Sequence, residues 1–147
     1  MSDERLSVLK KAYKLLGSRE HSRLQLKRKL SRGFDEDLVE LVLDELAGEG
    51  LQSDERYAES FVRSRIDRGH GPIRIANELR EHGVDELLID TYLDFSRPDW
   101  VERAREVRDK RFGEGIEADY EQRAKQARFL QYRGFTSEQI RRVLDLD

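Results

Sequence analysis

Apolar residues recur along the chain at spacings of three and four residues, and no stretch alternates apolar and polar positions as a strand would. Each apolar run is short and most end near a glycine, so the pattern predicts nine short helices. The apolar stripes expected to face a core are Leu6, Leu9, Tyr13 and Leu16; Leu26 and Leu30; Leu38, Leu41, Val42 and Leu46; Ala58, Phe61, Val62 and Ile66; Ile75, Ala76 and Leu79; Leu88, Tyr92 and Phe95; Val101, Ala104 and Val107; Ala124, Ala127 and Leu130; Ile140 and Leu144.

A glycine followed by an apolar residue recurs about every 50 residues, which indicates an internal repeat. The three pairs are Gly33-Phe34, Gly83-Val84 and Gly134-Phe135, and each precedes a helix-capping residue, namely Asp35, Asp85 or Thr136. Thr136 also forms a capping-box pattern with Gln139. Leucines stand four residues before the second and third glycines but three before the first, so the first turn should differ from the other two.

The repeat predicts an all-α fold of three tandem three-helix repeats, spanning residues 1–50, 51–96 and 97–147. A bundle of roughly 50 residues buries little surface alone, so neighbouring repeats should stack into an elongated array, straight or curved. Phe61, Tyr92 and Phe129 are then expected to pack in the core or between repeats.

The stretch RGHGPIRIANELREHGV, residues 68–84, contains glycines and a proline that could belong to a phosphate-binding loop or to a helix junction. Gly69 suits a helix end that needs a positive φ, Pro72 suits the first turn of the next helix, and Gly83 suits that helix's end. Phosphate and dinucleotide motifs require a preceding strand and further residues that are absent here. The stretch is therefore predicted to join two helices.

Composition limits the function classes. The 147 residues are 37% hydrophobic and 40% charged, with a net charge of -3, so neither a thick core nor a global positive field is expected. The chain has no Cys, no apolar run long enough to span a membrane, and no apolar signal-peptide core near its start. We expect a cytoplasmic protein that does not enter a membrane.

The sequence offers little catalytic chemistry. His21, His70 and His82 lack metal-ligand spacing, and His70 and His82 are more simply polar residues of loops and helix ends. The acidic residues 35–37 could hold a metal, but at the start of a helix they are more simply explained as caps. No catalytic residue, metal or cofactor is expected, and a binding protein is favoured over an enzyme.

Charge is distributed unevenly along the first 60 residues: residues 19–32 carry a net +5 and residues 35–59 a net -9. Most cations elsewhere have an acid one helical turn away, which favours a solvated helix face. Within the helix that ends near Arg32, however, Arg28, Lys29 and Arg32 have no such partner, and Arg65 and Arg68 also have none. Either the acidic third helix neutralises these cations within the fold or an external partner does, and Arg68 also suits a helix C-terminus.

The segment LQSDERYAESFVRSRIDRGHGPIRIANELREHGV resembles the central signature of the bacterial RecX family. The segments DWVERAREVRDKRFG and KQARFLQYRGFTSEQIRRVL resemble the third module of the same family, so the resemblance covers essentially the whole chain. The family prefers two acids where this chain has QSDE, and the first module departs further at Gly33. The matching positions are Leu51, Asp54, Tyr57, Ala58, Phe61, Val62, Arg65, Gly71, Arg74, Ile75, Glu78, Leu79 and Gly83.

The resemblance implies tandem three-helix repeats and a non-enzymatic regulator that binds the RecA recombinase filament on single-stranded DNA. It implies restraint of strand exchange, ATP hydrolysis and coprotease activity, and a monomer would suit binding in the filament groove. The residues predicted to contact the filament or its DNA are Arg28, Lys29, Arg32, Arg65, Arg68 and Arg74, of which Arg74 also has Glu78 within reach. The alternative is an autonomous DNA-binding module whose recognition helix spans residues 72–82, although the negative net charge weighs against it.

Overall fold

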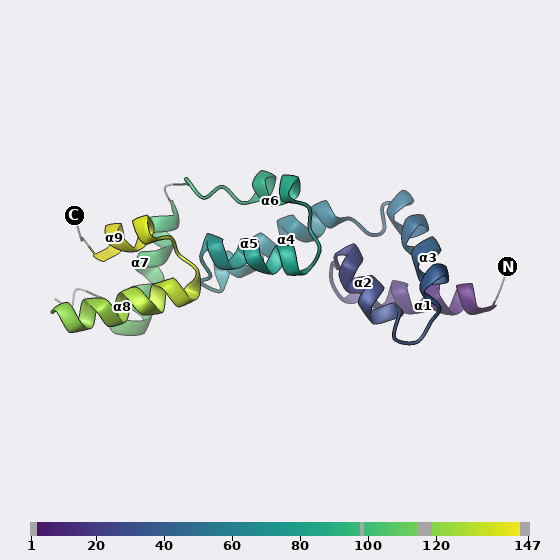
Figure 1. Ribbon diagram of the computed structural model, residues 1–147, viewed down its shortest axis with the longest axis horizontal. Coiled ribbons are helices and arrows are strands. Elements are labelled where there is room, and N and C mark those ends of the chain that lie inside the picture. The colour runs from purple at the N-terminus through teal and green to yellow at the C-terminus, as the bar shows by residue number, and fades with distance from the viewer. Residues whose placement is uncertain (1–2, 98, 115–118, 145–147) are drawn as a thin grey trace. The chain divides into compact units, whose positions relative to one another are not determined.

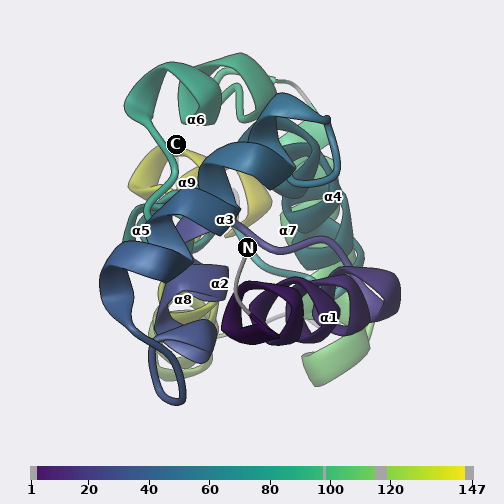
Figure 2. The same cartoon turned by 90° about the vertical axis from the view of Figure 1, so that its right-hand side faces the viewer.

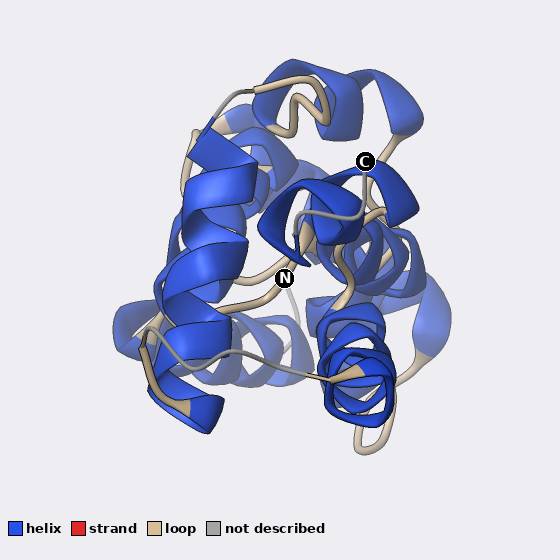
Figure 3. Ribbon diagram, turned by 90° about the vertical axis from the view of Figure 1, so that its left-hand side faces the viewer, coloured by secondary structure: helices blue, strands red, loops and turns tan. Residues whose placement is uncertain are grey.

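The computed structural model describes residues 3–97, 99–114 and 119–144. These residues form nine α-helices joined by loops and include no strand, which confirms the predicted all-α fold (Figures 1 and 3). The helices are α1 (Asp3–Ser18), α2 (Arg23–Leu30), α3 (Glu36–Gly48), α4 (Asp54–Asp67), α5 (Pro72–Glu81), α6 (Glu86–Tyr92), α7 (Asp99–Phe112), α8 (Tyr120–Arg133) and α9 (Ser137–Leu144).

The chain divides into two compact units. Unit 1 comprises the residues up to Ser60 together with Leu79–Ile89, and unit 2 comprises Phe61–Glu78 together with the residues from Asp90 onward. Helices α4, α5 and α6 therefore contribute residues to both units. The repeat boundaries after residues 50 and 96 stay a prediction.

In unit 1, helices α1, α2 and α3 each pack against the other two around an aliphatic core (Figure 2). The predicted stripes are partly wrong, because Leu6, Tyr13 and Leu41 are exposed. These helices have apolar residues on two adjacent faces, and packing against the other helices decides which face is buried. On α1 the core includes Val8 and Ala12, and on α3 it includes Val39 and Leu43. The core residues are Val8, Leu9, Ala12, Leu26, Leu30, Val39, Val42, Leu43 and Leu46.

In unit 2, helices α7, α8 and α9 also pack against one another. The only tryptophan of the sequence, Trp100, is buried and its indole Nε1 donates to the Asp94 carbonyl at 2.6 Å. Phe61 is buried as expected, whereas Phe129 is only half-buried. The other buried hydrophobic residues described in unit 2 are Val62, Ile75, Ala76, Leu93, Ala104, Leu130, Phe135, Ile140, Val143 and Leu144.

The helix caps predicted at Thr136 and Asp35 are present, and the one at Asp85 stays a prediction. The Thr136 hydroxyl accepts a hydrogen bond from the backbone N–H of Gln139. The side-chain Oε1 of Gln139 accepts one from the backbone N–H of Thr136, which completes the capping box. Asp35 accepts from the Leu38 N–H at the start of α3. These bonds satisfy N–H groups that the first turn of a helix leaves without a partner.

The junction glycines adopt the conformations expected of them. Gly69, Gly83 and Gly134 all have positive φ, and α5 begins at Pro72. Gly33 does not belong to this group, and the Phe34 N–H bonds to Leu30, whereas Val84 and Phe135 each reach one residue further back. The missing residue thus gives the first repeat a different turn.

In each unit, the start of one helix contacts the glycine turn at the end of another helix. In unit 2, the Gly71 N–H donates to the Arg133 carbonyl at 2.7 Å and the Ile73 N–H donates to the Gly134 carbonyl at 2.9 Å. In unit 1, the Ser22 hydroxyl donates to the His82 carbonyl at 2.7 Å, and Leu24 packs over Gly83. Each contact joins the start of one helix, α5 or α2, to a glycine turn that follows another, α8 or α5.

Gly134→Ala should lower the free energy of unfolding by about 2–4 kcal/mol. Its φ is +100°, and an added Cβ would lie 2.4 Å from the Cβ of Arg74, so backbone strain and overpacking combine. Urea unfolding followed by circular dichroism measures the change. Gly17→Ala is the control, because Gly17 lies in α1 with nothing near an added Cβ and should be neutral or stabilising. Equal unfolding midpoints for Gly134→Ala and wild type would contradict this account.

Candidate functional site

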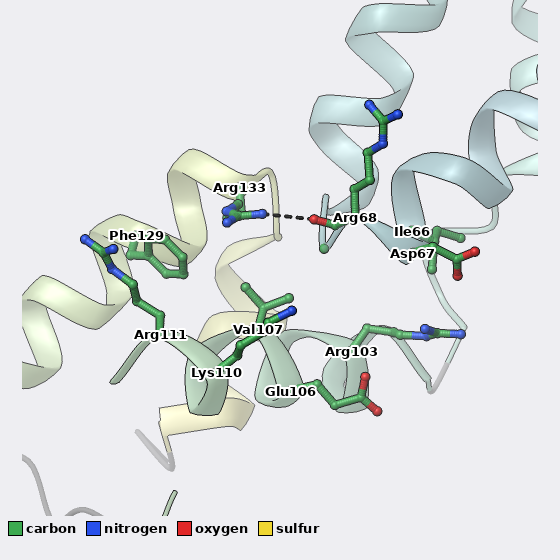
Figure 4. Close-up of a pocket in the computed structure, with 11 residues that line it drawn as sticks. Ile66, Asp67, Arg68, Arg103, Glu106, Val107, Lys110, Arg111, Phe129 and Arg133 are labelled. Atoms are coloured by element: carbon green, nitrogen blue, oxygen red, sulfur yellow. Dashed lines mark hydrogen bonds between the residues drawn. The ribbon is translucent and has the colours of Figure 1, made fainter. Parts of the chain in front are cut away.

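Unit 2 contains a cleft of about 350 Å³ that is rich in cationic side chains (Figure 4). The end of α4 and the following turn form one wall, and α7 and α8 form the others. We call this site the basic cleft. It is lined by Ile66, Asp67, Arg68, Gly69, Arg103, Glu106, Val107, Lys110, Arg111, Phe129 and Arg133.

Helical spacing brings the lining residues of α7 and α8 together. On α7, Arg103, Val107, Lys110 and Arg111 follow one another at intervals of four, three and one residues, which places them on one face. Arg133 lies one turn after Phe129 on α8. Gly69 lets the α4 end approach closely, since a Cβ there would lie 3.0 Å from Val107.

Five cations and two acids line the basic cleft. Arg133 donates to the Arg68 carbonyl at 3.0 Å, and its guanidinium carbon lies 5.2 Å from the Phe129 ring centroid (Figure 4). The guanidinium of Arg111 lies 5.5 Å from the same ring. Neither Asp67 nor Glu106 forms an ion pair with another residue that the structure describes, and the same holds for the five cations. The excess of positive charge in the cleft is therefore not compensated by close ion pairs.

Of the predicted contact residues, only Arg68 lines this cleft. Its carbonyl anchors Arg133, while its guanidinium points away from Phe129 (Figure 4). The backbone of Arg68 thus has a structural role and its exposed side chain remains open to a partner.

Glu78 pairs with two other predicted contact residues. The Glu78 carboxylate lies 3.7 Å from Arg65 and 3.5 Å from Arg74, and His70 is a third neighbour at 3.7 Å. The Arg65 guanidinium also covers the Phe61 ring at 4.4 Å. The charge of Arg65 is therefore neutralised within the fold, which is one of the two predicted alternatives. The acid, Glu78, belongs to α5 and not to the third helix of a repeat.

The remaining predicted residues lie on unit 1, where the acids of α3 neutralise part of the basic helix. Arg23 pairs with Glu40 and Asp44, and Lys27 pairs with Glu36 and Glu40. Hydrogen bonds from Arg23 and then Lys27 hold the pKa of Glu40 below its usual value. The acidic helix α3 thus neutralises Arg23 and Lys27, the two cations on the side of α2 that faces it.

On the other face of α2, the cations have no acidic partner among the described residues. Arg28 and Arg32 are exposed, and together with Lys29 and Arg19 they form what we call the α2 patch. None of the four forms an ion pair with a residue in the described part of the chain. Arg28 donates only to the Glu81 carbonyl, at 3.3 Å. Arg28, Lys29 and Arg32 therefore stay available to a partner.

The buried side chain of His21 contacts two residues of the α2 patch, Arg19 and Lys29. It is almost fully buried, its Nδ1 lies 3.0 Å from the Arg19 carbonyl, and Lys29 donates to its Nε2 at 3.0 Å. Burial, followed by Arg19 and Arg32, lowers the pKa of Lys29, and burial is also the largest cause of the lowered pKa of His21. A bound anion would relieve the repulsion between these cations.

Four cations of the basic cleft were not predicted from the sequence: Arg103, Lys110, Arg111 and Arg133. Acids stand near three of them in the sequence, so a search for locally unpaired cations passes over them. For the three cations on α7, namely Arg103, Lys110 and Arg111, their position on one helix face was the available signal. Among the described residues, no cluster of His, Asp and Glu could hold a metal ion. No helix in the described part of the chain is long and apolar enough to cross a membrane.

These features define an all-α protein of tandem three-helix domains that carries two basic surfaces. Three family models match the chain: the first three-helix domain of RecX at residues 9–46, the second at 53–93 and the third at 98–144. The chain belongs to the RecX family.

Relatives over most of the chain are named regulatory protein RecX. The protein of Halorhodospira halophila is 51% identical over 131 residues, covering 88% of this chain and 81% of the relative. The protein of Pseudomonas entomophila is 46% identical over 143 residues, covering 97% and 92%. The family assignment supports a regulatory role.

Solved structures show the same fold. The crystal structure of RecX from Lactobacillus salivarius aligns over the whole of both chains with a TM-score of 0.81 and 23% identity. A second crystal structure, of a regulatory protein RecX, aligns over 99% of this chain and 73% of the other with a TM-score of 0.82 and 25% identity. The fold is thus retained at low sequence identity.

Glu78→Gln should lower the free energy of unfolding by about 1–2 kcal/mol, because it leaves the half-buried Arg65 and Arg74 without their shared carboxylate. Arg68→Ala should change it by less than about 0.5 kcal/mol, because that side chain is exposed. Urea unfolding of both variants provides the comparison. Equal destabilisation by the two would contradict the distinction between a structural and an available arginine.

Stability should fall as the pH is lowered from 7.5 to 5.5. Burial and then Arg74 lower the pKa of His70, so the unfolded chain takes up a proton below about pH 6.5 that the folded chain resists. His70→Gln should show a shallower decrease in the free energy of unfolding over this range. If the variant and wild type lose stability in parallel, His70 does not contribute to the pH dependence.

Proposed function

We propose that this protein binds the filament that RecA forms on single-stranded DNA and restrains its strand exchange, ATP hydrolysis and coprotease activity. It acts by binding, without catalysis, as a cytoplasmic monomer. The observation that carries the proposal is the match of all three RecX domains, in order, to this one chain.

The charge distribution supports this proposal. The α2 patch of unit 1 and the basic cleft of unit 2 both present cations that are not paired with acids. The chain as a whole has a net charge of -3. A protein with local positive surfaces but a negative net charge is better suited to a partner that offers both protein surface and phosphates than to bare nucleic acid.

The alternative of an autonomous DNA-binding module is less well supported. The start of α5 is occupied within the fold, since the N–H groups of Gly71 and Ile73 bond to carbonyls at the end of α8. Its exposed face includes Ile73 and Arg80, and Glu86 pairs with Arg80 at 2.7 Å. This helix therefore lacks the cluster of available cations that DNA binding requires.

The chain should bind RecA filaments more tightly than the same bare single-stranded DNA, and the advantage should grow between about 50 and 200 mM salt. Binding to bare DNA depends on released counterions and weakens steeply over this range, whereas protein contacts do not. Anisotropy of a labelled DNA, with and without RecA, measures both affinities. Tight, steeply salt-dependent binding to bare DNA with no gain from RecA would instead favour the DNA-binding module.

Arg28→Glu with Arg32→Glu tests the α2 patch in the same assay and should weaken filament binding roughly tenfold. Lys11→Glu with Lys14→Glu is the matched control, because it changes the charge equally on exposed positions of α1. Equal weakening by both pairs would show an effect of net charge rather than of the patch.

A further inference from the structure

The basic cleft of unit 2 places an aromatic ring among cations, and this combination selects a class of ligand. Phe129 is half-buried, and two guanidinium groups, of Arg111 and Arg133, lie 5.5 and 5.2 Å from its ring centroid. Phe112 meets the ring edge-on, with centroids 5.4 Å apart. The ring is thus held in place by its neighbours while part of its surface faces solvent.

The charge of the cleft favours an anionic ligand. Arg103, Lys110 and Arg111 project from one face of α7 without ion pairs to other described residues. Guanidinium groups offer paired N–H donors that match the oxygens of a phosphate. The cleft volume of about 350 Å³ lies within the range of small-ligand sites, roughly 300–1,000 Å³.

We propose that the basic cleft binds single-stranded nucleic acid, with phosphates on Arg103, Lys110 and Arg111 and one base against Phe129. Cations along a groove and aromatic side chains on which bases can stack are the two elements of sequence-tolerant single-strand binding, and the cleft combines its cations with the partly exposed ring of Phe129. Bases of a duplex are stacked on one another and cannot reach the ring. An acidic peptide would satisfy the cations but would leave Phe129 without a role.

This inference rests on the proposed function for its biological setting, the DNA strand within the filament. It assigns the strand contact to the surface of α7 and α8, and not to α5. The α2 patch, which belongs to the other unit, consists of the cations Arg19, Arg28, Lys29 and Arg32, whereas the lining of the basic cleft also includes the aromatic ring of Phe129.

Lys110→Glu with Arg111→Glu should weaken binding of fluorescein-labelled (dT)12, measured by anisotropy at about 50 mM salt, at least tenfold. Both residues are exposed, so the variant should fold, and circular dichroism verifies this. Arg128→Glu with Arg141→Glu is the matched control: it changes the charge of unit 2 equally at exposed positions outside the cleft. The control should lose no more than about twofold.

Phe129→Leu tests the base contact separately, because it keeps apolar volume but removes the ring. It should weaken (dT)12 binding at least about fivefold, with an unchanged salt slope. An acidic peptide of equal length and charge should compete poorly with (dT)12 for the wild-type chain. The proposal is overturned if wild type does not bind (dT)12, if the cleft pair and the control pair lose affinity equally, or if the peptide displaces the oligonucleotide.

The assay without RecA separates this inference from the proposed function. If (dT)12 binding depends on the cleft but the wild-type chain has no effect on RecA filaments, the proposed function fails and the cleft assignment stands. If the chain binds filaments and the cleft variants bind (dT)12 as wild type does, the cleft assignment fails alone.

Discussion

Close backbone packing at a glycine turn is the constraint on which the rest of this structure depends. In unit 2 the carbonyl group of Gly134 approaches Gly71 so closely that a Cβ on Gly71 would lie 2.4 Å from its carbon. Two backbone hydrogen bonds, from Gly71 and Ile73, cross this contact. Only residues without side chains allow such an approach, and Gly83 is under a similar constraint, since an added Cβ would lie 2.8 Å from Leu24. The constraint therefore explains the second and third glycines of the repeat but not Gly33, where nothing lies within 4 Å of an added Cβ.

The contact also positions the chemistry. Because the Arg133 carbonyl accepts the Gly71 N–H, the end of α8 is fixed beside the end of α4, and the Arg133 side chain reaches the Arg68 carbonyl. These bonds close one wall of the basic cleft. Gly69 and Gly71, which belong to the stretch that could have suggested a phosphate loop, thus help to frame the basic cleft, whose cations come mainly from α7.

The sequence predicted the helices, their caps and the glycine turns because these depend on local chemistry. Positive φ at Gly69 and Gly83 and the Thr136 capping box follow from the residue types themselves. The apolar stripes were less predictable, since Leu6 and Leu41 continue a stripe in the sequence but face solvent. Burial depends on neighbouring helices, which sequence spacing does not reveal.

The candidate site was predicted only in part, for the same physical reason. Local spacing correctly marked Arg28 and Arg32 as lacking helical partners, but it could not show that Glu78 from α5 reaches Arg65 on α4. Conversely, acids lie near Lys110 in the sequence, but none of the described acids forms an ion pair with it. Charge pairing between helices is a tertiary property, so the unpaired cations on α7 become visible only in the structure.

The rate of RecA ATP hydrolysis on single-stranded DNA, measured while this chain is titrated, tests the central claim most directly. A regulator that binds the filament should lower the rate progressively and with saturation at physiological salt, and the Arg28→Glu with Arg32→Glu variant should require a higher concentration for the same effect. An unchanged rate with the folded wild-type chain in excess over RecA would contradict the account.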